Sequence, residues 1–291
     1  MTRGLDELVN LLALEQIEQN LFRGQSKDPG WGVLYGGHVL GKALSAATQT
    51  VPAERRVHSL HAYFLRPGDV TKPVVYEVDR IRDGKSFTTR RVVAIQSGEP
   101  IFNMSASFQT PEDSFDHQAS MPDVPPPEDL ENDQVRLARF GDRLPKWGQA
   151  NLRLEQPIDI RTVDADDPIA PTQREPRRAI WFRAVDKLPD DPALHANLFA
   201  YASDHGFVTT SLIPHGVSWM GQDVQVASID HIIWFHRPFR FDEWLLYAMD
   251  SPNAFGARGL ARGSVYTRDG LLVASTAQEG LIRRRKPKPA T

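Results

Sequence analysis

The sequence of 291 residues contains no cysteine, which excludes disulfide bonds, zinc–thiolate sites and thiol catalysis. That absence is typical of a chain from a reducing compartment. The sequence has no apolar run as long as the roughly eighteen residues that a membrane helix needs. Its first residues do not show the basic segment followed by an apolar segment that marks a signal peptide. The net charge of −3 shows none of the basic excess of a general polyanion binder. We therefore expect a soluble cytoplasmic protein that binds no nucleic acid and does not insert into a membrane.

Several common chemical motifs are missing as well. There is no G-x-S-x-G elbow for a hydrolase serine and no H-E-x-x-H zinc motif. The stretch Gly30–Gly37 completes neither common nucleotide-binding pattern, so it is interpreted as a tight turn from a strand into a helix. Strand alternation places Asp230 and His236 on one face and His231 on the other, and hydrogen bonding at strand ends explains them better than a metal. We expect no metal and no cofactor.

The sequence does contain an internal repeat. The stretch Ser228–Phe239 is rich in the branched and aromatic residues that favour a strand, and Pro238 ends the apolar run. A cruder copy stands at Ser59–Pro67, and a shift of 171 positions (232 − 61) lays His61 on Ile232. The apolar pattern then matches over about fifty positions, which indicates a duplicated domain, because solenoids need three or more short repeats.

The same shift aligns Asp79 with Asp250 and Arg91 with Arg262. Each half is predicted to contain a helix rich in small residues and then a meander of strands, with turn signals such as Asp83-Gly84 between them. In the first half we expect helices at 5–14 and 38–49 and strands at 15–24, 57–65, 72–81, 87–96 and 100–108. Farther along we expect helices at 130–144 and 193–204 and strands at 152–163, 180–185, 225–236, 243–249, 257–266 and 271–282.

Between the two halves the composition changes, because five prolines stand among acidic residues. This composition predicts a solvated linker at 111–149, between an N-terminal unit at 1–110 and a C-terminal unit at 150–286. A tail follows at 287–291. The basic run Arg283–Lys288 is interpreted as a solvated end in preference to a contact for an anionic ligand.

Asp204 is the most suggestive single carboxylate. It lies at or near the end of an apolar, alanine-rich helix, where a carboxylate is costly to bury without partners. The alternative is that the helix has begun to fray and Asp204 faces solvent. Composition alone leaves both interpretations open.

Five stretches carry a resemblance to a known family. Val226–Pro238, Val273–Gly280, Gly32–His38, His58–Gly68 and Arg82–Phe87 resemble the acyl-CoA thioesterase II family of bacterial and peroxisomal enzymes. The resemblance covers nearly the whole chain. It implies an α+β double hotdog fold, in which two tandem units each have an antiparallel β-sheet wrapped around a central helix. It also implies a homo-oligomer, a dimer or tetramer, because hotdog sheets often pair through exposed edges.

The resemblance implies a catalytic group as well. In the family an aspartate, a hydroxyl residue and a glutamine hold a water, and they fall on Asp204, Ser228 and Gln278 of this chain. Much of the family is expected to have threonine at the serine position, so the hydroxyl is kept and the β-branch that stiffens χ1 is lost. His58 is a further candidate, although a histidine at the start of a strand is more often structural.

The expected reaction is hydrolysis of acyl-CoA to a free fatty acid and CoA. Asp204 would accept the proton of a water that Ser228 and Gln278 position. Since Gln278 aligns with Ser107, one catalytic group per chain is expected, in the second half. The alternatives are a non-catalytic acyl-CoA-binding module and another hotdog enzyme such as an enoyl-CoA hydratase, whose Gly-Asp-x-Asn-Pro-x-His segment is absent. The chain does not end in a Ser-Lys-Leu-type peroxisomal signal, which agrees with a cytoplasmic enzyme.

Overall fold

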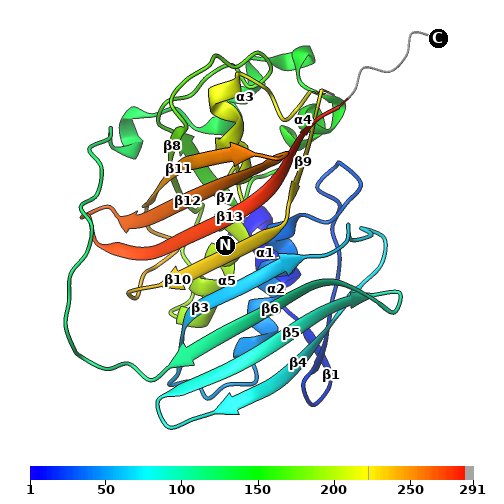
Figure 1. Ribbon diagram of the computed structural model, residues 1–291, viewed down its shortest axis with the longest axis vertical. Coiled ribbons are helices and arrows are strands. Elements are labelled where there is room, and N and C mark those ends of the chain that lie inside the picture. Colours follow the sequence, from blue (N-terminus) through cyan, green and yellow to red (C-terminus); the bar gives the residue numbers. More distant parts are fainter. Residues whose placement is uncertain (222, 286–291) are drawn as a thin grey trace.

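The computed structural model describes residues 1–221 and 223–285, whose strands form one continuous antiparallel sheet (Figure 1). No helix of this described part is long and apolar enough to span a membrane. Its helices are α1 Arg3–Leu12, α2 Gly36–Thr48, α3 Asp133–Ala138, α4 Lys146–Asn151 and α5 Pro192–Ser203, with 3₁₀ turns η1 Pro127–Asp129, η2 Gly141–Arg143 and η3 Val208–His215. Its strands are β1 Glu15–Glu18, β2 Leu21–Gly24, β3 Arg56–Phe64, β4 Val74–Asp83, β5 Phe87–Gln96, β6 Glu99–Gln109, β7 Ile158–Thr162, β8 Arg177–Ala184, β9 Val224–Ser228, β10 Asp230–Phe235, β11 Leu245–Phe255, β12 Arg258–Thr267 and β13 Leu272–Arg284.

The two halves of the sheet have the same strand order and are related by a local two-fold axis. The first half runs β1-β2-β4-β5-β6-β3, and the second continues β10-β13-β12-β11-β8-β7, so β3 and β10 join the halves. In that join His61 pairs with Ile232 and Tyr63 pairs with Asp230. The shift of 171 also carries His61 onto Ile232, so the local two-fold axis passes through this pair. Each half has a helix against its part of the sheet, and the expected double hotdog fold is confirmed.

Finer details are repeated too. β5 and β12 lie 171 positions apart at both ends (258 − 87 and 267 − 96). The pairing of β4 with β5 becomes irregular after Asp79, and that of β11 with β12 becomes irregular after Asp250. Arg91 donates to Asp79 at 3.0 Å, and Arg262 donates to Asp250 at 2.6 Å. The duplication therefore extends to a bulge and to one ion pair at the same place in each half.

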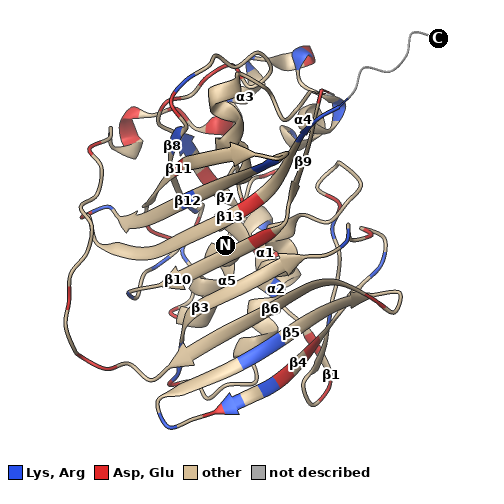
Figure 2. Ribbon diagram, in the orientation of Figure 1, with Lys and Arg blue, Asp and Glu red and all other residues tan. Residues whose placement is uncertain are grey.

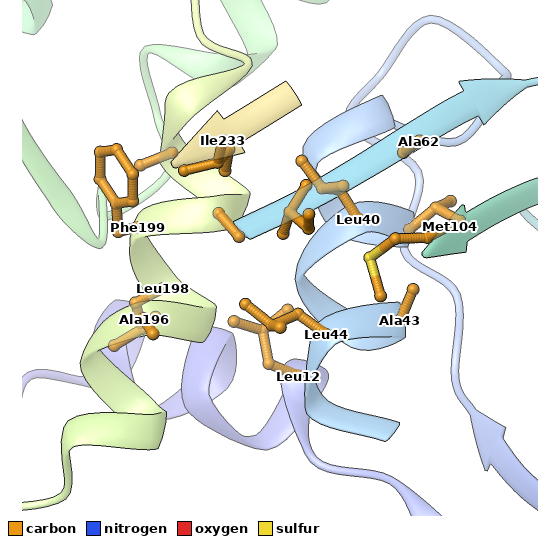
Figure 3. Packing of buried hydrophobic residues seen from close by; sticks show 14 of the residues in the cluster. Leu12, Leu40, Ala43, Leu44, Ala62, Met104, Ala196, Leu198, Phe199 and Ile233 are labelled. Carbon is orange, nitrogen blue, oxygen red and sulfur yellow. The ribbon is translucent and has the colours of Figure 1, made fainter. Parts of the chain in front are cut away.

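The central helices α2 and α5 pack directly against each other and are buried along most of their length. Glycine permits the close approach: a Cβ on Gly37 would lie 2.1 Å from the Tyr201 carbonyl oxygen, and one on Gly41 would lie 3.0 Å from the Asn197 carbonyl oxygen. Gly37 faces Tyr201, and the later residue Gly41 faces the earlier residue Asn197, so the two helices run antiparallel. Figure 3 shows the apolar side chains around this contact, among them Leu12, Leu40, Ala43, Leu44, Ala62, Met104, Ala196, Leu198, Phe199 and Ile233.

Two predicted strands are divided in the structure. The strand predicted at 15–24 is a hairpin of β1 and β2, because Asn20 between them has φ 67°, a left-handed conformation that asparagine tolerates. The strand predicted at 225–236 breaks at Ile229 into β9 and β10. Next to the break, the side chain of Asp230 accepts a hydrogen bond from the Glu279 N–H at 2.6 Å. A side chain therefore supplies an acceptor where the strand is interrupted.

The region at 130–163 also differs from the prediction. The helix predicted at 130–144 is α3 over Asp133–Ala138 alone, and Gly141, with φ 45°, follows it. Pro145 then precedes α4, which was not predicted. The strand predicted at 152–163 is reduced to β7.

The segment that connects the halves runs along one side of the molecule (Figure 1) and is exposed over residues 111–120. Beyond them it packs on the second half, because Met121 and Val124 contact a satellite apolar cluster that includes Trp181. The indole N–H of Trp181 donates to the Pro125 carbonyl oxygen at 2.9 Å. These contacts were not expected of a solvated linker, because a proline-rich acidic composition does not indicate where single apolar residues dock.

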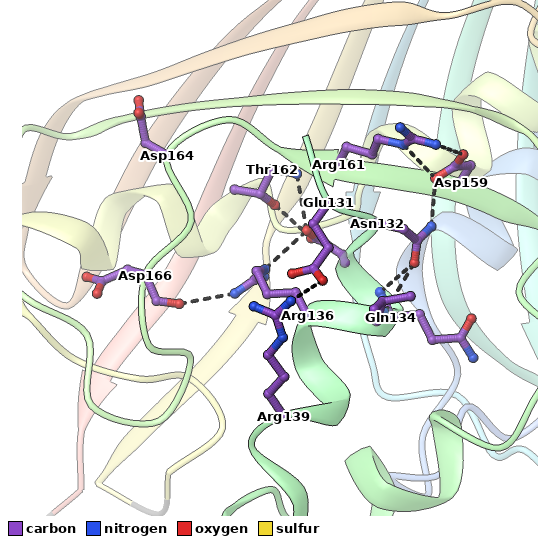
Figure 4. Close-up of polar contacts among 12 residues, drawn as sticks. Glu131, Asn132, Gln134, Arg136, Arg139, Asp159, Arg161, Thr162, Asp164 and Asp166 are labelled. Atoms are coloured by element: carbon purple, nitrogen blue, oxygen red, sulfur yellow. Dashed lines mark hydrogen bonds and ion pairs between the residues drawn. The ribbon is translucent and has the colours of Figure 1, made fainter. Parts of the chain in front are cut away.

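Polar contacts hold α3 against β7 (Figure 4). The side chain of Asn132 caps the helix by accepting from the Gln134 N–H at 2.8 Å, and its amide donates to Asp159 at 2.6 Å. The Asp133 carboxylate accepts from both the N–H and the hydroxyl of Thr162, at 3.1 and 2.7 Å.

Charged residues of both signs are interspersed along the strands and loops in Figure 2. β13 reaches Arg284, two residues beyond the predicted end. The tail at 287–291, and with it the end of the basic run at Lys286–Lys288, lies outside the described residues.

Candidate active site

The structure brings Asp204, Ser228 and Gln278 together. Asp204 is the residue that ends α5, with φ −80° and ψ −8°, and its side chain is only 6 % exposed. The Gln278 amide nitrogen donates to Asp204 Oδ1 at 2.7 Å and to Ser228 Oγ at 3.0 Å. The Ser228 hydroxyl is 3.5 Å from Asp204 Oδ1, a long hydrogen bond. The interpretation of Asp204 as a frayed, solvent-facing residue is therefore wrong.

Strand geometry explains why the hydroxyl and the amide meet. Ser228 is the last residue of β9 and pairs with Gly280 of β13. Gln278 stands two positions earlier on β13, on the same face, so it is the diagonal neighbour of Ser228. Its side chain is fully buried.

The first half completes the site. The backbone N–H of Gly37, in the first turn of α2, donates to Asp204 Oδ2 at 2.9 Å. First-turn N–H groups have no partner within their own helix, so α2 has this donor available for the carboxylate. A Cβ on Gly36 would lie 2.7 Å from that same oxygen. The glycine-rich stretch Gly30–Gly37 was predicted to be only a tight turn into a helix. In the structure its last glycines also let the N-terminus of α2 approach Asp204, which the sequence motif did not indicate.

Burial and hydrogen bonding act on Asp204 in opposite directions. Burial raises the pKa of its carboxyl to about 6, while the hydrogen bonds from Gln278, Gly37 and Ser228 work to lower it. Within residues 1–221 and 223–285 no lysine or arginine lies within 4.0 Å of the carboxylate. A carboxyl with this pKa is largely ionised at neutral pH and can still accept a proton readily, which suits a general base.

His58 lies elsewhere. Its Nε2 is 2.8 Å from Ser107 Oγ, and its ring meets that of Phe87 at 5.6 Å between centroids. Ser107 is the counterpart of Gln278 under the 171 shift (278 − 171). His58 therefore contacts the place in the first half that corresponds to the position of Gln278, and neither of these two contacts is to Asp204.

The three residues considered for a metal make separate contacts. Asp230 accepts from the Glu279 N–H, and His236 Nε2 is 2.8 Å from Ser275 Oγ. The interpretation of these two as strand-end hydrogen-bonding residues is confirmed. His231 is fully buried, and its Nδ1 lies 3.9 Å from Asp204 Oδ1, so this histidine adjoins the site.

Two surface hollows, of about 340 and 390 Å³, have other linings. One is lined by residues such as Arg183 of β8 and Trp244, which precedes β11, and the other by α1 and residues 25–27. The candidate site is thus recognised by its converging polar groups and not by the size of a cavity.

Comparison with known proteins identifies relatives of both halves. The family model described as "Acyl-CoA thioesterase" matches residues 150–281, and the one described as "Acyl-CoA thioesterase N-terminal domain" matches residues 27–109. Acyl-CoA thioesterase 2 of Haemophilus influenzae is 43% identical over 283 residues, which cover 97% of this chain and 99% of that protein. Acyl-coenzyme A thioesterase 8 of Homo sapiens is 41% identical over 285 residues, covering 95% of this chain and 88% of that protein.

A solved structure gives the same result. The crystal structure of the acyl-CoA thioesterase II TesB2 from Mycobacterium marinum has a TM-score of 0.79 and 41% sequence identity, and the match covers 97% of this chain and all of that one. Both halves, and therefore both contributors to the site, fall within these matches. The chain belongs to the acyl-CoA thioesterase II family and is an acyl-CoA thioester hydrolase.

Proposed function

We propose that this enzyme hydrolyses fatty acyl-CoA to free fatty acid and CoA by direct attack of a water held by Asp204, Ser228 and Gln278. The water oxygen bonds to the thioester carbonyl carbon, the C–S bond then breaks, and the proton taken from the water ends on the CoA thiolate. The observation that carries the proposal is the convergence of a buried carboxylate, a hydroxyl and an amide within hydrogen-bonding distance of one another.

Asp204 acts as the general base. A group that accepts a proton in the transition state works best with a pKa near the working pH, and burial holds the pKa of Asp204 at about 6. The chain has no cysteine to serve as a nucleophile, and it has no serine elbow. Water activated by the carboxylate is therefore the simplest nucleophile.

Gln278 and Ser228 position the water and the base. The two N–H bonds of the Gln278 amide are directed at Asp204 Oδ1 and Ser228 Oγ, so one rigid group fixes both neighbours. The Ser228 hydroxyl makes only a long contact to Asp204, which leaves it free to turn toward a bound water.

The test is release of free thiol from a series of acyl-CoA substrates by the wild type and by Asp204→Asn. The variant keeps the shape and removes the proton acceptor, so kcat should fall by about 10²–10⁴-fold. Binding of acyl-CoA, measured by calorimetry, should survive. Asp250→Asn is the matched control, because Asp250 is an aspartate of the same half that forms an exposed ion pair with Arg262.

A fully active Asp204→Asn enzyme would overturn the assignment and return His58 to consideration. Release of no thiol from any acyl-CoA, with binding intact, would favour the alternative of a non-catalytic binding module. Consumption of an enoyl-CoA without thiol release would favour hydration.

A further inference from the structure

His231 is a buried titratable group that the proposed reaction does not use. It stands on β10, its side chain is fully buried, and its ring meets that of Phe207 at 5.6 Å between centroids. Its Nδ1 lies 3.9 Å from Asp204 Oδ1 and has no hydrogen-bond partner among the described residues. Its Nε2 lies 2.9 Å from Ser203 Oγ.

The hydrogen atoms around Ser203 determine which ring nitrogen of His231 carries the proton. Ser203 Oγ is 2.9 Å from the Ala200 carbonyl oxygen, which can only accept, so the single hydroxyl hydrogen of Ser203 points there. Ser203 Oγ must then accept from His231, and Nε2 carries the hydrogen. In a neutral imidazole the other nitrogen has a lone pair, so Nδ1 presents a lone pair toward Asp204.

The ring is neutral at ordinary pH, because burial lowers the pKa of His231 to about 3. The other titratable groups that face Asp204 are Tyr35, before α2, and Tyr247, on β11, and burial raises the pKa of both phenols well above the usual value. Their hydroxyls donate elsewhere, Tyr35 to the Tyr201 carbonyl oxygen and Tyr247 to that of Ser203, both at 3.1 Å. Of these three titratable side chains, His231 is therefore the one that presents to the carboxylate a ring nitrogen unpartnered within the described part of the chain.

We propose that His231 is a positioning residue of this site, which acts on the protonation of Asp204 through an Nδ1 lone pair that Ser203 holds in place. The lone pair repels the ionised carboxylate and, after a small closure, accepts the hydrogen of the protonated carboxyl. It thereby favours the protonated form of Asp204, which arises when the carboxylate takes a proton from the water. The proposal rests on the proposed function in one respect, that Asp204 is the base.

Two variants separate this role from simple packing. His231→Phe keeps an aromatic ring in the buried position and removes both ring nitrogens, including the acceptor that faces Asp204. Ser203→Ala leaves the imidazole in place but frees its tautomer, so that the ring can donate from Nδ1 to the carboxylate. Both changes favour the ionised carboxylate, and both should move the acid limb of kcat/KM to lower pH by about half a unit or more, within the range that neighbouring groups impose on a carboxyl.

Ser211→Ala is the matched control. Ser211 is buried like Ser203 and donates to a carbonyl three residues earlier, that of Val208, at 2.6 Å. The Ser211→Ala enzyme loses the same kind of local hydrogen bond but keeps every contact of His231. The acid limb of its kcat/KM profile should therefore coincide with that of the wild type. A purely structural role for His231 predicts lower kcat in the variants with no change in the pH at which activity is lost.

A second readout does not depend on turnover. Carbon-13 NMR of protein labelled at the aspartate carboxyl carbons, with Asp204→Asn to assign the signal, gives the titration of Asp204 directly. The signal should titrate at lower pH in Ser203→Ala and in His231→Phe than in the wild type. Unchanged titration in Ser203→Ala, which retains the ring, would overturn the inference even if His231→Phe failed to fold. A fully active Asp204→Asn enzyme would instead refute the role of Asp204 as general base. The NMR titration would still decide whether His231 acts on the Asp204 carboxyl.

Discussion

The Asp204 carboxylate, which the second half contributes, accepts a hydrogen bond at 2.9 Å from the backbone N–H of Gly37, which belongs to the first half. The two residues are 167 positions apart: Gly37 lies in the first turn of α2, and Asp204 is the C-cap of α5. The candidate site is therefore a contact between halves, although its three side chains all come from the second. Any change in how α2 and α5 pack displaces a donor from the proposed base.

Gly37→Ala tests that dependence. A Cβ at this position would lie 2.1 Å from the Tyr201 carbonyl oxygen, so α2 must move away from α5. We expect a loss of about 1–3 kcal/mol in the free energy of unfolding, as for overpacked cores, together with a fall in kcat. Gly148→Ala is the control in α4, because its Cβ would make only ordinary contact, 3.5 Å from the Leu144 Cβ. Urea denaturation measures the free energy of unfolding, and thiol release measures kcat. Equal losses in Gly37→Ala and Gly148→Ala would contradict the expectation.

Gln278→Ala removes the amide that joins Asp204 to Ser228. One hydrogen bond to a charged group is worth about 1.5–3 kcal/mol, so kcat should fall roughly 10–100-fold, less than for Asp204→Asn. In the Asp204→Asn background the same change should have little further effect, because the groups hold a single water. Fully multiplicative losses in a double-mutant cycle would show that the residues act independently.

Ser228→Thr should be tolerated or should increase turnover. The hydroxyl remains, and the β-branch restricts χ1, which helps to hold the oxygen toward the water. Ser228→Ala should lower kcat by roughly tenfold, as expected from the loss of a single hydrogen bond. Comparison of kcat for the two variants is the measurement, and a threonine enzyme as impaired as the alanine enzyme would count against the role of the hydroxyl.

Asp204 should also make the stability depend on pH. Its pKa in the folded protein, about 6, lies above the ordinary value of 3.8, so the folded state binds the proton more tightly. The resulting stabilisation is fully present below pH 3.8 and is lost as the pH rises through 6. For a shift of about 2 units it amounts to up to about 3 kcal/mol.

Asn at position 204 does not titrate, so the difference in unfolding free energy between wild type and Asp204→Asn isolates this effect. Relative to the variant, the wild type should be stabler at pH 4.5 than at pH 7.5. Denaturant titrations at the two pH values give the difference, and a constant difference would mean that burial does not perturb this carboxyl.

The sequence predicted the duplicated fold well because both halves keep the same periodic pattern. Alternating apolar residues and turn signals place the meanders. The aligned Asp79 and Asp250 prove to stand at a bulge and an ion pair that recur, which the alignment did not predict. The break at Ile229 was missed because it depends on the Asp230 side chain reaching the Glu279 N–H, a contact that no local pattern signals.

The site was predicted only in part, for a related reason. The resemblance supplied Asp204, Ser228 and Gln278, and the structure places them together. Strand alternation separated His231 from Asp230, but it could not indicate that the face of His231 is the one that Asp204 occupies. Gly37 acts through its backbone N–H, which every residue except proline possesses, so its part depends entirely on tertiary packing.

The pairing of β3 with β10 has a consequence for how the two halves diverge. Each of these strands would be an open edge in a separate half, a row of unpaired N–H and C=O groups that promotes aggregation. In one chain the pairing is intramolecular and does not weaken on dilution. A dimer of identical units would carry every substitution twice. Fusion allows Gln278 in one half and Ser107 at the matching position in the other, so the two copies can carry different side chains at the same place in the fold.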